Sequence, residues 1–150
     1  IMKNLKSLKI YTYDFEGYYA TIDSFGSYFK HNMELLDKQI RDELFGARDI
    51  YTKVRDSAPS KYGDSAVVRN SLVSDGCIVE GTVENSILFR GVKVGKGSVV
   101  KNSIIMQDTV IGENVSLNCV VTDKNVVIRD RRMLSGCEIQ PYFLPKGSMV

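Results

Sequence analysis

A four-residue block recurs four times in the second half of the chain and constrains its fold more than any other feature. The block starts with asparagine and ends with two aliphatic residues, at positions 70–73 (NSLV), 85–88 (NSIL), 102–105 (NSII) and 118–121 (NCVV). Successive blocks start 15, 17 and 16 residues apart. A second aliphatic cluster follows each block after four or five residues, at Ile78-Val79, Val92 with Val94, Val110-Ile111 and Val126-Val127.

This period is too short for a solenoid of helical pairs and too long for a heptad. It suits a coil of three short strands, with aliphatic side chains inside and glycine or asparagine at the corners, because both tolerate unusual backbone angles. Successive coils would stack at the usual inter-strand distance of about 4.8 Å. Antiparallel hairpins would instead need strict alternation and Asn-Gly or Asp-Gly turns, which do not dominate here. The sequence therefore predicts a mainly β fold, a left-handed parallel β-helix of the hexapeptide-repeat type.

About four such coils would leave an unpaired strand edge at each end. We expect the helix that precedes the repeat to cap one end. Residues 129–150, which include the apolar stretch PYFLP at 141–145, are expected to cap the other end or to pair with another subunit. We therefore expect the chain to oligomerise along the prism.

The first part of the chain predicts a different organisation. Residues 1–22 are rich in strand formers and predict two short strands. Residues 24–45 have apolar side chains at a 3.6-residue period and predict one amphipathic helix, capped by Asp23 or Ser24 and ended by Gly46, with Glu34 and Lys38 as an ion pair.

Residues 47–65 read as a connection in which Ile50, Tyr51 and Val54 could form one strand. A boundary near Tyr62 divides the chain into residues 1–62, with the short strands and the linker helix, and residues 63–150, with the β-helix.

Composition excludes several classes of protein. The chain has 43% apolar and 25% charged residues and a net charge of +2, which favours neither nucleic acid nor an anionic membrane as a partner. The three cysteines, Cys77, Cys119 and Cys137, contain no C-x-x-C pair, so we expect buried or inert thiols in a reducing cytoplasm. We expect no signal peptide and no membrane span. Because Ile1 precedes Met2, we expect the chain to be a fragment.

Three stretches together resemble a known family. Residues 85–107 are similar to the C-terminal β-helix of glucose-1-phosphate adenylyltransferase (ADP-glucose pyrophosphorylase), and the stretches YDFEGYY at 13–19 and SYFKHNMELL at 27–36 are similar to the end of its nucleotidyltransferase domain and its linker helix. The resemblance covers nearly all of this chain but only about the last two fifths of a full family member. It implies the reaction of ATP with glucose 1-phosphate to give ADP-glucose and pyrophosphate, for glycogen synthesis.

The chain departs from the family at one position. Catalytic members carry the motif Gly-Tyr-Trp-x-Asp-Val-Gly-Thr, whose aspartate helps to hold the magnesium ion of the nucleotide phosphates. Here Thr21 stands at the aspartate position, and a neutral hydroxyl is a poor ligand for a hard cation. Asp23, two residues on, is a weaker alternative, because residues i and i+2 of a strand share a face.

That departure resembles the regulatory GlgD-type subunit, which modulates a homologous catalytic subunit within a heterotetramer. We therefore expect no catalytic residue, no metal ligand and no cofactor in this chain, and we expect magnesium on the catalytic partner. A catalytic subunit with a displaced ligand is the alternative. Self-association through the β-helix is the alternative to a heterotetramer.

Few other residues suggest chemistry. His31, the only histidine, lies on the predicted helix, so a histidine-dependent hexapeptide acyltransferase trimer remains only an alternative. Gly76, Gly95 and Gly97 are predicted corners and lack the context of a phosphate loop.

Phosphorylated sugars regulate the family that the chain resembles, and arginine binds phosphate through paired hydrogen bonds. Arg129, Arg131 and Arg132 are therefore the candidate effector site, with a solvated turn as the alternative. Four other basic residues are predicted on the outside of the coils as solubilising charges: Arg90, Lys93, Lys96 and Lys101.

Overall fold

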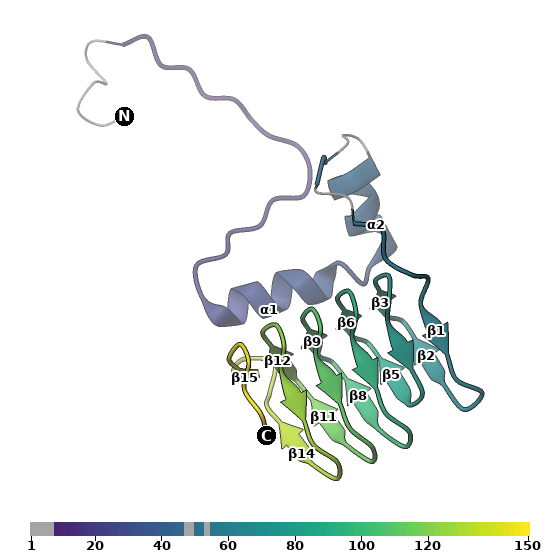
Figure 1. Ribbon diagram of the computed structural model, residues 1–150. Helices are drawn as coiled ribbons and strands as arrows, with labels where there is room; N and C mark the ends of the chain where they lie inside the picture. Colours follow the sequence, from purple (N-terminus) through teal and green to yellow (C-terminus); the bar gives the residue numbers. More distant parts are fainter. Residues whose placement is uncertain (1–7, 47–49, 53–54) are drawn as a thin grey trace.

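The computed structural model describes residues 8–46, 50–52 and 55–150. A segment without regular structure leads into α1 (Phe25–Glu34), which is followed by α2 (Lys38–Arg41) and a single π-helical turn, η2 (Asp42–Gly46). All the strands follow, and they wind into a stack of coils (Figure 1).

The strands form three parallel sheets of five strands each. The first sheet contains β1 (Lys61–Tyr62), β4 (Ile78–Val79), β7 (Lys93–Val94), β10 (Val110–Ile111) and β13 (Val127–Ile128). The second contains β2 (Val67–Arg69), β5 (Thr82–Glu84), β8 (Val99–Lys101), β11 (Ser116–Asn118) and β14 (Met133–Ser135). The third contains β3 (Leu72–Val73), β6 (Ile87–Leu88), β9 (Ile104–Ile105), β12 (Val120–Thr122) and β15 (Tyr142–Leu144).

Successive strands visit the three sheets in turn, so each coil contributes one strand to each sheet. Within a coil, one aliphatic side chain from each strand points into the prism, as Val94, Val100 and Ile105 do in the third coil, and all three are 0–1% exposed. Burying such stacks removes apolar surface from water, which is the main stabilising term in folding. The predicted parallel β-helix of the hexapeptide type is confirmed.

Stacked serines form a hydrogen-bonded ladder through one corner of the coils. The Oγ of Ser71 accepts from the backbone N–H of Ser86 at 3.1 Å, the Oγ of Ser86 accepts from Ser103 N–H at 3.1 Å, and the Oγ of Ser103 accepts from Val120 N–H at 3.1 Å. Each hydroxyl also donates to the carbonyl two residues earlier. The serines of the repeat thus satisfy backbone groups where consecutive coils lack a direct bond.

The fourth repeat block is one residue out of register from the prediction. Val121 pairs with Ile104 and Asn118 pairs with Lys101, so Cys119, not Asn118, occupies the asparagine position. Its φ of 51° matches the 47° of Asn102. The side chain of Asn118 still contacts the asparagine of the preceding coil, because its Oδ1 accepts from Asn102 Nδ2 at 2.9 Å. That hydrogen bond explains why an asparagine is found beside the corner.

The last segment forms a fifth coil, where four coils were expected. Strands β14 and β15 belong to it, and Val127 bridges Met149 near the end of the chain. Val150 packs on the interior of the prism. Residues 129–150 thus close this end of the stack, one of the two predicted roles.

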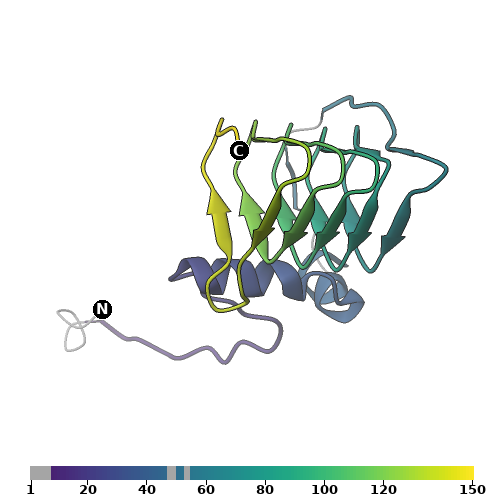
Figure 2. The ribbon, with the colours of Figure 1, turned by 90° about the horizontal axis from the view of Figure 1, so that it is seen from below.

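Helix α1 lies along the side of the β-helix, so the expectation that it caps an end is wrong. Figures 1 and 2 show it crossing successive coils beside the third sheet. The outward residues of that sheet are apolar at all five levels, unlike those of the other two sheets: Leu72, Ile87, Ile104, Val121 and Phe143. An amphipathic helix buries more apolar area on such a face than on the end of the stack.

The predicted single helix is broken after Glu34. The side chain of Asp37 accepts from the N–H of Gln39 at 2.7 Å and starts a new helix, so it competes with continuation of the first one. Because of this break Lys38 pairs with Asp42 at 3.0 Å and not with Glu34. Gly46 ends the π-helical turn without the predicted left-handed φ.

Ser24 caps α1 as one of the two predicted residues. Its hydroxyl accepts from Ser27 N–H at 3.1 Å. The two predicted strands do not form within residues 8–22, because no described strand lies beside them to pair with. Ile50 and Tyr51 are exposed and outside any strand, and Val54 lies outside the described residues.

Candidate functional site

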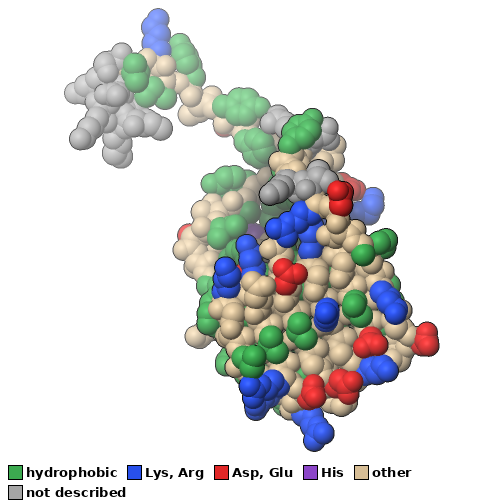
Figure 3. Space-filling view, viewed as in Figure 1, with side chains coloured by type: hydrophobic (Ala, Val, Ile, Leu, Met, Phe, Trp, Pro, Cys, Tyr) green, Lys and Arg blue, Asp and Glu red, His purple; other side chains and the backbone are tan. Residues whose placement is uncertain are grey.

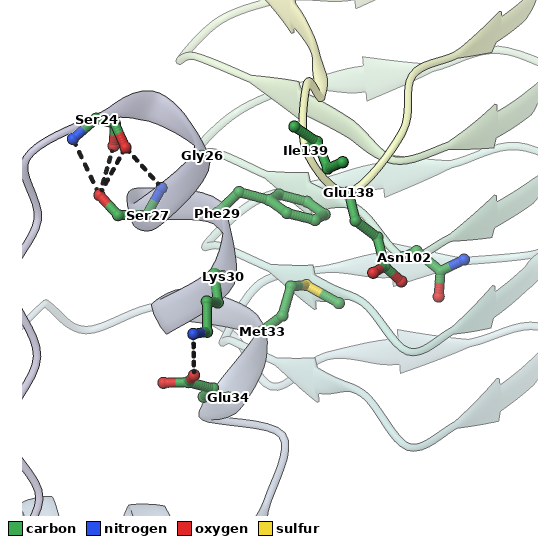
Figure 4. Close-up of a pocket in the computed structure, with 10 residues that line it drawn as sticks. All are labelled: Ser24, Gly26, Ser27, Phe29, Lys30, Met33, Glu34, Asn102, Glu138 and Ile139. Carbon is green, nitrogen blue, oxygen red and sulfur yellow. Dashed lines mark hydrogen bonds and ion pairs between the residues drawn. The ribbon is translucent and has the colours of Figure 1, made fainter.

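The junction between α1 and the third sheet contains a groove of about 860 Å³. Phe29 and Met33 on the helix and Asn102 on the β-helix line it, and the loop with Glu138 and Ile139 forms the opposite wall (Figure 4). Polar residues from the N-cap to the last residue of α1 also line it: Ser24, Ser27, Lys30 and Glu34. No nucleophile with an adjacent base lies among these lining residues.

Phe29 anchors the helix to the β-helix. Its side chain is 3% exposed and packs with Ile104, Cys119 and Val121 from two coils. Phe25, one turn earlier, meets Phe143 edge-on, with ring centroids 5.4 Å apart. These contacts fix the start of α1, and with it residues 21–24, relative to the coils.

A three-residue polar cluster ties the preceding segment to α1. The Tyr18 hydroxyl donates to Glu34 Oε2 at 2.7 Å, and His31 Nδ1 lies 2.8 Å from the same oxygen. The hydrogen bond to the carboxylate raises the pKa of Tyr18 to about 12, because ionising the phenol would lose the bond and place two anions together. The hydrogen bonds from His31 and Tyr18 hold the pKa of Glu34 below its ordinary value. His31 is therefore part of a structural contact on the helix.

The predicted metal-ligand position does not have a metal-binding environment. The Thr21 hydroxyl is exposed and donates to the hydroxyl of Tyr19 at 3.1 Å. Asp23 uses its backbone N–H to donate to Ser27 Oγ, which places it at the start of α1. Within residues 8–46, 50–52 and 55–150, no group of three or more His, Cys, Asp or Glu could hold a metal ion. Magnesium does not fit these residues.

The candidate effector arginines lie at one corner of the fifth coil and are all exposed. Arg131 has a φ of 59° and stacks above Asn114 at the equivalent corner. The guanidinium of Arg129 donates to Met149 Sδ at 3.0 Å. Asp130 accepts from the backbone N–H of Glu113 at 2.8 Å. The corner is therefore built by backbone stacking, and its three arginines are exposed.

The other predicted charges fall on the outer surface. Lys101 lies 2.9 Å from Glu84, which Arg69 also approaches at 3.8 Å, so three coils share one ion-pair ladder. The bond from Lys101 lowers the pKa of Glu84. Figure 3 shows basic and acidic side chains interspersed over the visible face of the β-helix, without a patch of one sign.

The cysteines are free, as expected, but they differ in exposure. Cys77 and Cys119 are buried and Cys137 is exposed. Burial raises the pKa of the thiols of Cys77 and Cys119, which makes them poor nucleophiles.

Sequence reasoning missed the groove and the polar cluster. The groove depends on the loop at residues 136–141, whose place beside α1 follows from the fifth coil. The cluster had a partial signal, because His31 and Glu34 are three residues apart and therefore share a helix face.

Comparison with known proteins agrees with this architecture. Residues 56–139 match the family described as "GlmU-like, C-terminal hexapeptide". The chain belongs to this hexapeptide family. It is 47% identical over 148 residues to "Glycogen biosynthesis protein GlgD" of Bacillus subtilis (strain 168), covering 98% of this chain and 43% of that relative.

Two further relatives extend the similarity. The GlgD protein of Geobacillus stearothermophilus is 47% identical over 119 residues, which are 79% of this chain and 35% of the relative. "Glucose-1-phosphate adenylyltransferase" of Fervidobacterium nodosum is 36% identical over 140 residues, 93% of this chain and 32% of the relative. The chain thus spans less than half the length of each of these three relatives. None of the helices in the described part has the length and apolar character needed to cross a membrane.

Proposed function

We propose that the chain is the C-terminal part of a regulatory and assembly subunit of glucose-1-phosphate adenylyltransferase, which acts in glycogen synthesis without catalysing the reaction itself. The match to GlgD over 98% of the chain carries this proposal. Thr21 supports it, because the resemblance places a carboxylate ligand at this position and the structure has an exposed hydroxyl there. Magnesium and nucleotide then bind to a homologous catalytic subunit, in a cytoplasmic heterotetramer.

Mixing the whole protein that contains this chain with its catalytic partner tests the proposal. Pyrophosphate release from ATP and glucose 1-phosphate measures the reaction. The whole protein alone should give no ADP-glucose, and adding it to the partner should change the rate or the response to effectors. An unchanged rate and response would count against a regulatory role.

The alternative of a displaced metal ligand predicts a different pattern. The whole protein alone would then make ADP-glucose, and Asp23→Ala would abolish that activity. Asp23→Asn should abolish the activity as well, because it removes the charge. It keeps the side-chain size at the start of α1, so a loss of activity would not come from a changed shape. The mass of the protein in solution tests a third alternative, a hexapeptide acyltransferase, because that class of enzyme would be a trimer.

The effector site belongs to the same proposal. Arg131 and Arg132 are consecutive exposed residues at one corner, and guanidinium groups bind phosphate through paired hydrogen bonds. Replacing both with alanine should weaken the response of the mixed enzyme to a sugar phosphate. The same replacement at Arg90 and Lys93 is a matched control on another part of the surface. Equal responses from the two variants would exclude this corner as the effector site.

A further inference from the structure

One corner of the β-helix is shorter than its neighbours. Between β4 and β5, only Glu80 and Gly81 connect Val79 to Thr82, whereas residues 95–98 connect β7 to β8. This explains the 15-residue spacing between the first two repeat blocks. The short corner is tightly stacked, because a Cβ on Gly81 would lie 2.4 Å from the carbonyl oxygen of Ser98.

The short corner leaves a notch between the longer corners on either side. The notch has a volume of about 430 Å³, within the range of small-ligand sites. Three successive coils line it: Lys61, Tyr62, Gly63, Asp64 and Ser65 from the first, Glu80 from the second and Lys96 from the third. It shares no lining residue with the groove beside α1, and the arginines at 129–132 lie two coils further along the same corner of the prism.

The lining has a balanced set of charges and an aromatic ring. The lining residues include two lysines, Lys61 and Lys96, and two carboxylate residues, Asp64 and Glu80. Among the residues that the structure describes, none of these four takes part in an ion pair. The ring of Tyr62 is 51% exposed and offers an apolar platform beside them.

This chemistry selects the class of ligand. The four formal charges sum to zero, so the notch does not favour a phosphate or another anion over a neutral molecule. Ammonium groups donate hydrogen bonds and carboxylates accept them, so together they satisfy a ligand with many hydroxyls. An exposed aromatic ring packs against a flat apolar surface. A hexopyranose has both features, with hydroxyls around its edge and C–H groups on its faces.

We propose that the notch formed by residues 61–65, Glu80 and Lys96 binds an uncharged hexopyranose unit, as found in a glucan chain. The proposal does not rest on the function proposed above, and either can fail alone. Calorimetric titration of the whole protein with maltoheptaose should show saturable binding. Inorganic phosphate, titrated separately, should not bind at the notch.

Two variants and one control localise the site. Lys96→Ala removes a charged donor, and Glu80→Gln leaves only a neutral acceptor. The paired variant should weaken binding at least about tenfold, which is the cost of one lost hydrogen bond to a charged group. Replacing Glu80 and Gly81 by the corner sequence of residues 95–98 should fill the notch and abolish binding. Lys124→Ala combined with Glu43→Gln removes the same charges from exposed positions away from this corner and should leave the affinity unchanged.

Several results would overturn the proposal. The first is the absence of saturable maltoheptaose binding with a Kd of about 10 mM or tighter. The second is equal weakening of binding by the notch variants and the control variant. The third is phosphate binding that the notch variants abolish. Circular dichroism identifies a corner replacement that does not fold, and the paired substitution, which alters only exposed or half-exposed side chains, then decides the outcome.

Discussion

Truncating a buried rung of the serine ladder should cost much more than truncating the exposed rung. Ser103 and Val120 are both fully buried, and the Oγ of Ser103 is the acceptor for the Val120 N–H. Ser103→Ala leaves that N–H without a partner where water cannot reach it. The carbonyl of Lys101 loses the serine hydroxyl but still accepts from Cys119 N–H at 3.2 Å. The cost is therefore essentially that of one orphaned donor.

An orphaned buried donor costs about 1–3 kcal/mol, so we expect Ser103→Ala to lower the free energy of unfolding by about 2 kcal/mol. For a chain of this size that corresponds to a fall in Tm of about 6 °C. Ser71→Ala removes the same kind of bond, but Ser71 is half-exposed and water can replace its hydroxyl. The expected loss is then about 0.5 kcal/mol.

Urea unfolding of the 150-residue chain and both variants, followed by circular dichroism, measures the difference. Amide hydrogen exchange at Val120 gives an independent reading, because protection there should fall in Ser103→Ala alone. Equal losses for the two variants, or a loss below about 0.5 kcal/mol for Ser103→Ala, would refute the reasoning that burial sets the cost.

Three further predictions concern a glycine, a tyrosine and the thiols. Gly95→Ala should destabilise the chain by about 2–3 kcal/mol in urea unfolding, because the added Cβ would lie 2.4 Å from a stacked carbonyl oxygen. Gly147→Ala is the control, because its Cβ would meet no atom within 4 Å. It should lose only about 1 kcal/mol, through the φ of 70° at this position. The raised pKa of Tyr18 means that its bond to Glu34 stabilises the fold below pH 10.0 and is lost as the pH rises through about 12, so Tyr18→Phe should remove the last tyrosine ionisation seen by phenolate absorbance. A thiol reagent should modify Cys137 rapidly and the other two cysteines only on unfolding; rapid modification of all three would contradict their burial.

The coil period was predictable because interior aliphatic residues must return to the same sheet once per turn. The exact pairing was harder to predict. Asn118 matches the asparagine of the other blocks by type, yet the backbone places Cys119 at that corner. Residue type alone could not decide, because the Asn118 amide keeps its ladder bond from the neighbouring position.

The upstream errors have a different cause. A strand propensity in residues 8–22 needs a partner strand to become a strand, and propensity cannot supply one. The apolar period of residues 24–45 was correct, but it does not show where Asp37 starts a second helix. Both outcomes depend on which groups are available to accept or donate hydrogen bonds locally.

The candidate sites were the least predictable from sequence. The notch follows from a two-residue difference between stacked corners, and its only signal in the sequence was the 15-residue spacing. The groove joins a helix to a loop more than 100 residues later, through Phe29 and Ile139. Neither site belongs to a local motif, because each forms only when distant coils stack.

The contacts that hold α1 at the junction are distinct from the metal-ligand position at Thr21. Tyr18 holds the preceding segment to α1, Ser24 caps the helix, and Phe29 buries it against the third sheet. Thr21 lies between these contacts and has no carboxylate. A junction held by these three contacts fixes the preceding segment relative to the β-helix, and with Thr21 it lacks the charge that the resemblance assigns to catalysis. This combination supports the proposed regulatory role more strongly than the missing ligand alone.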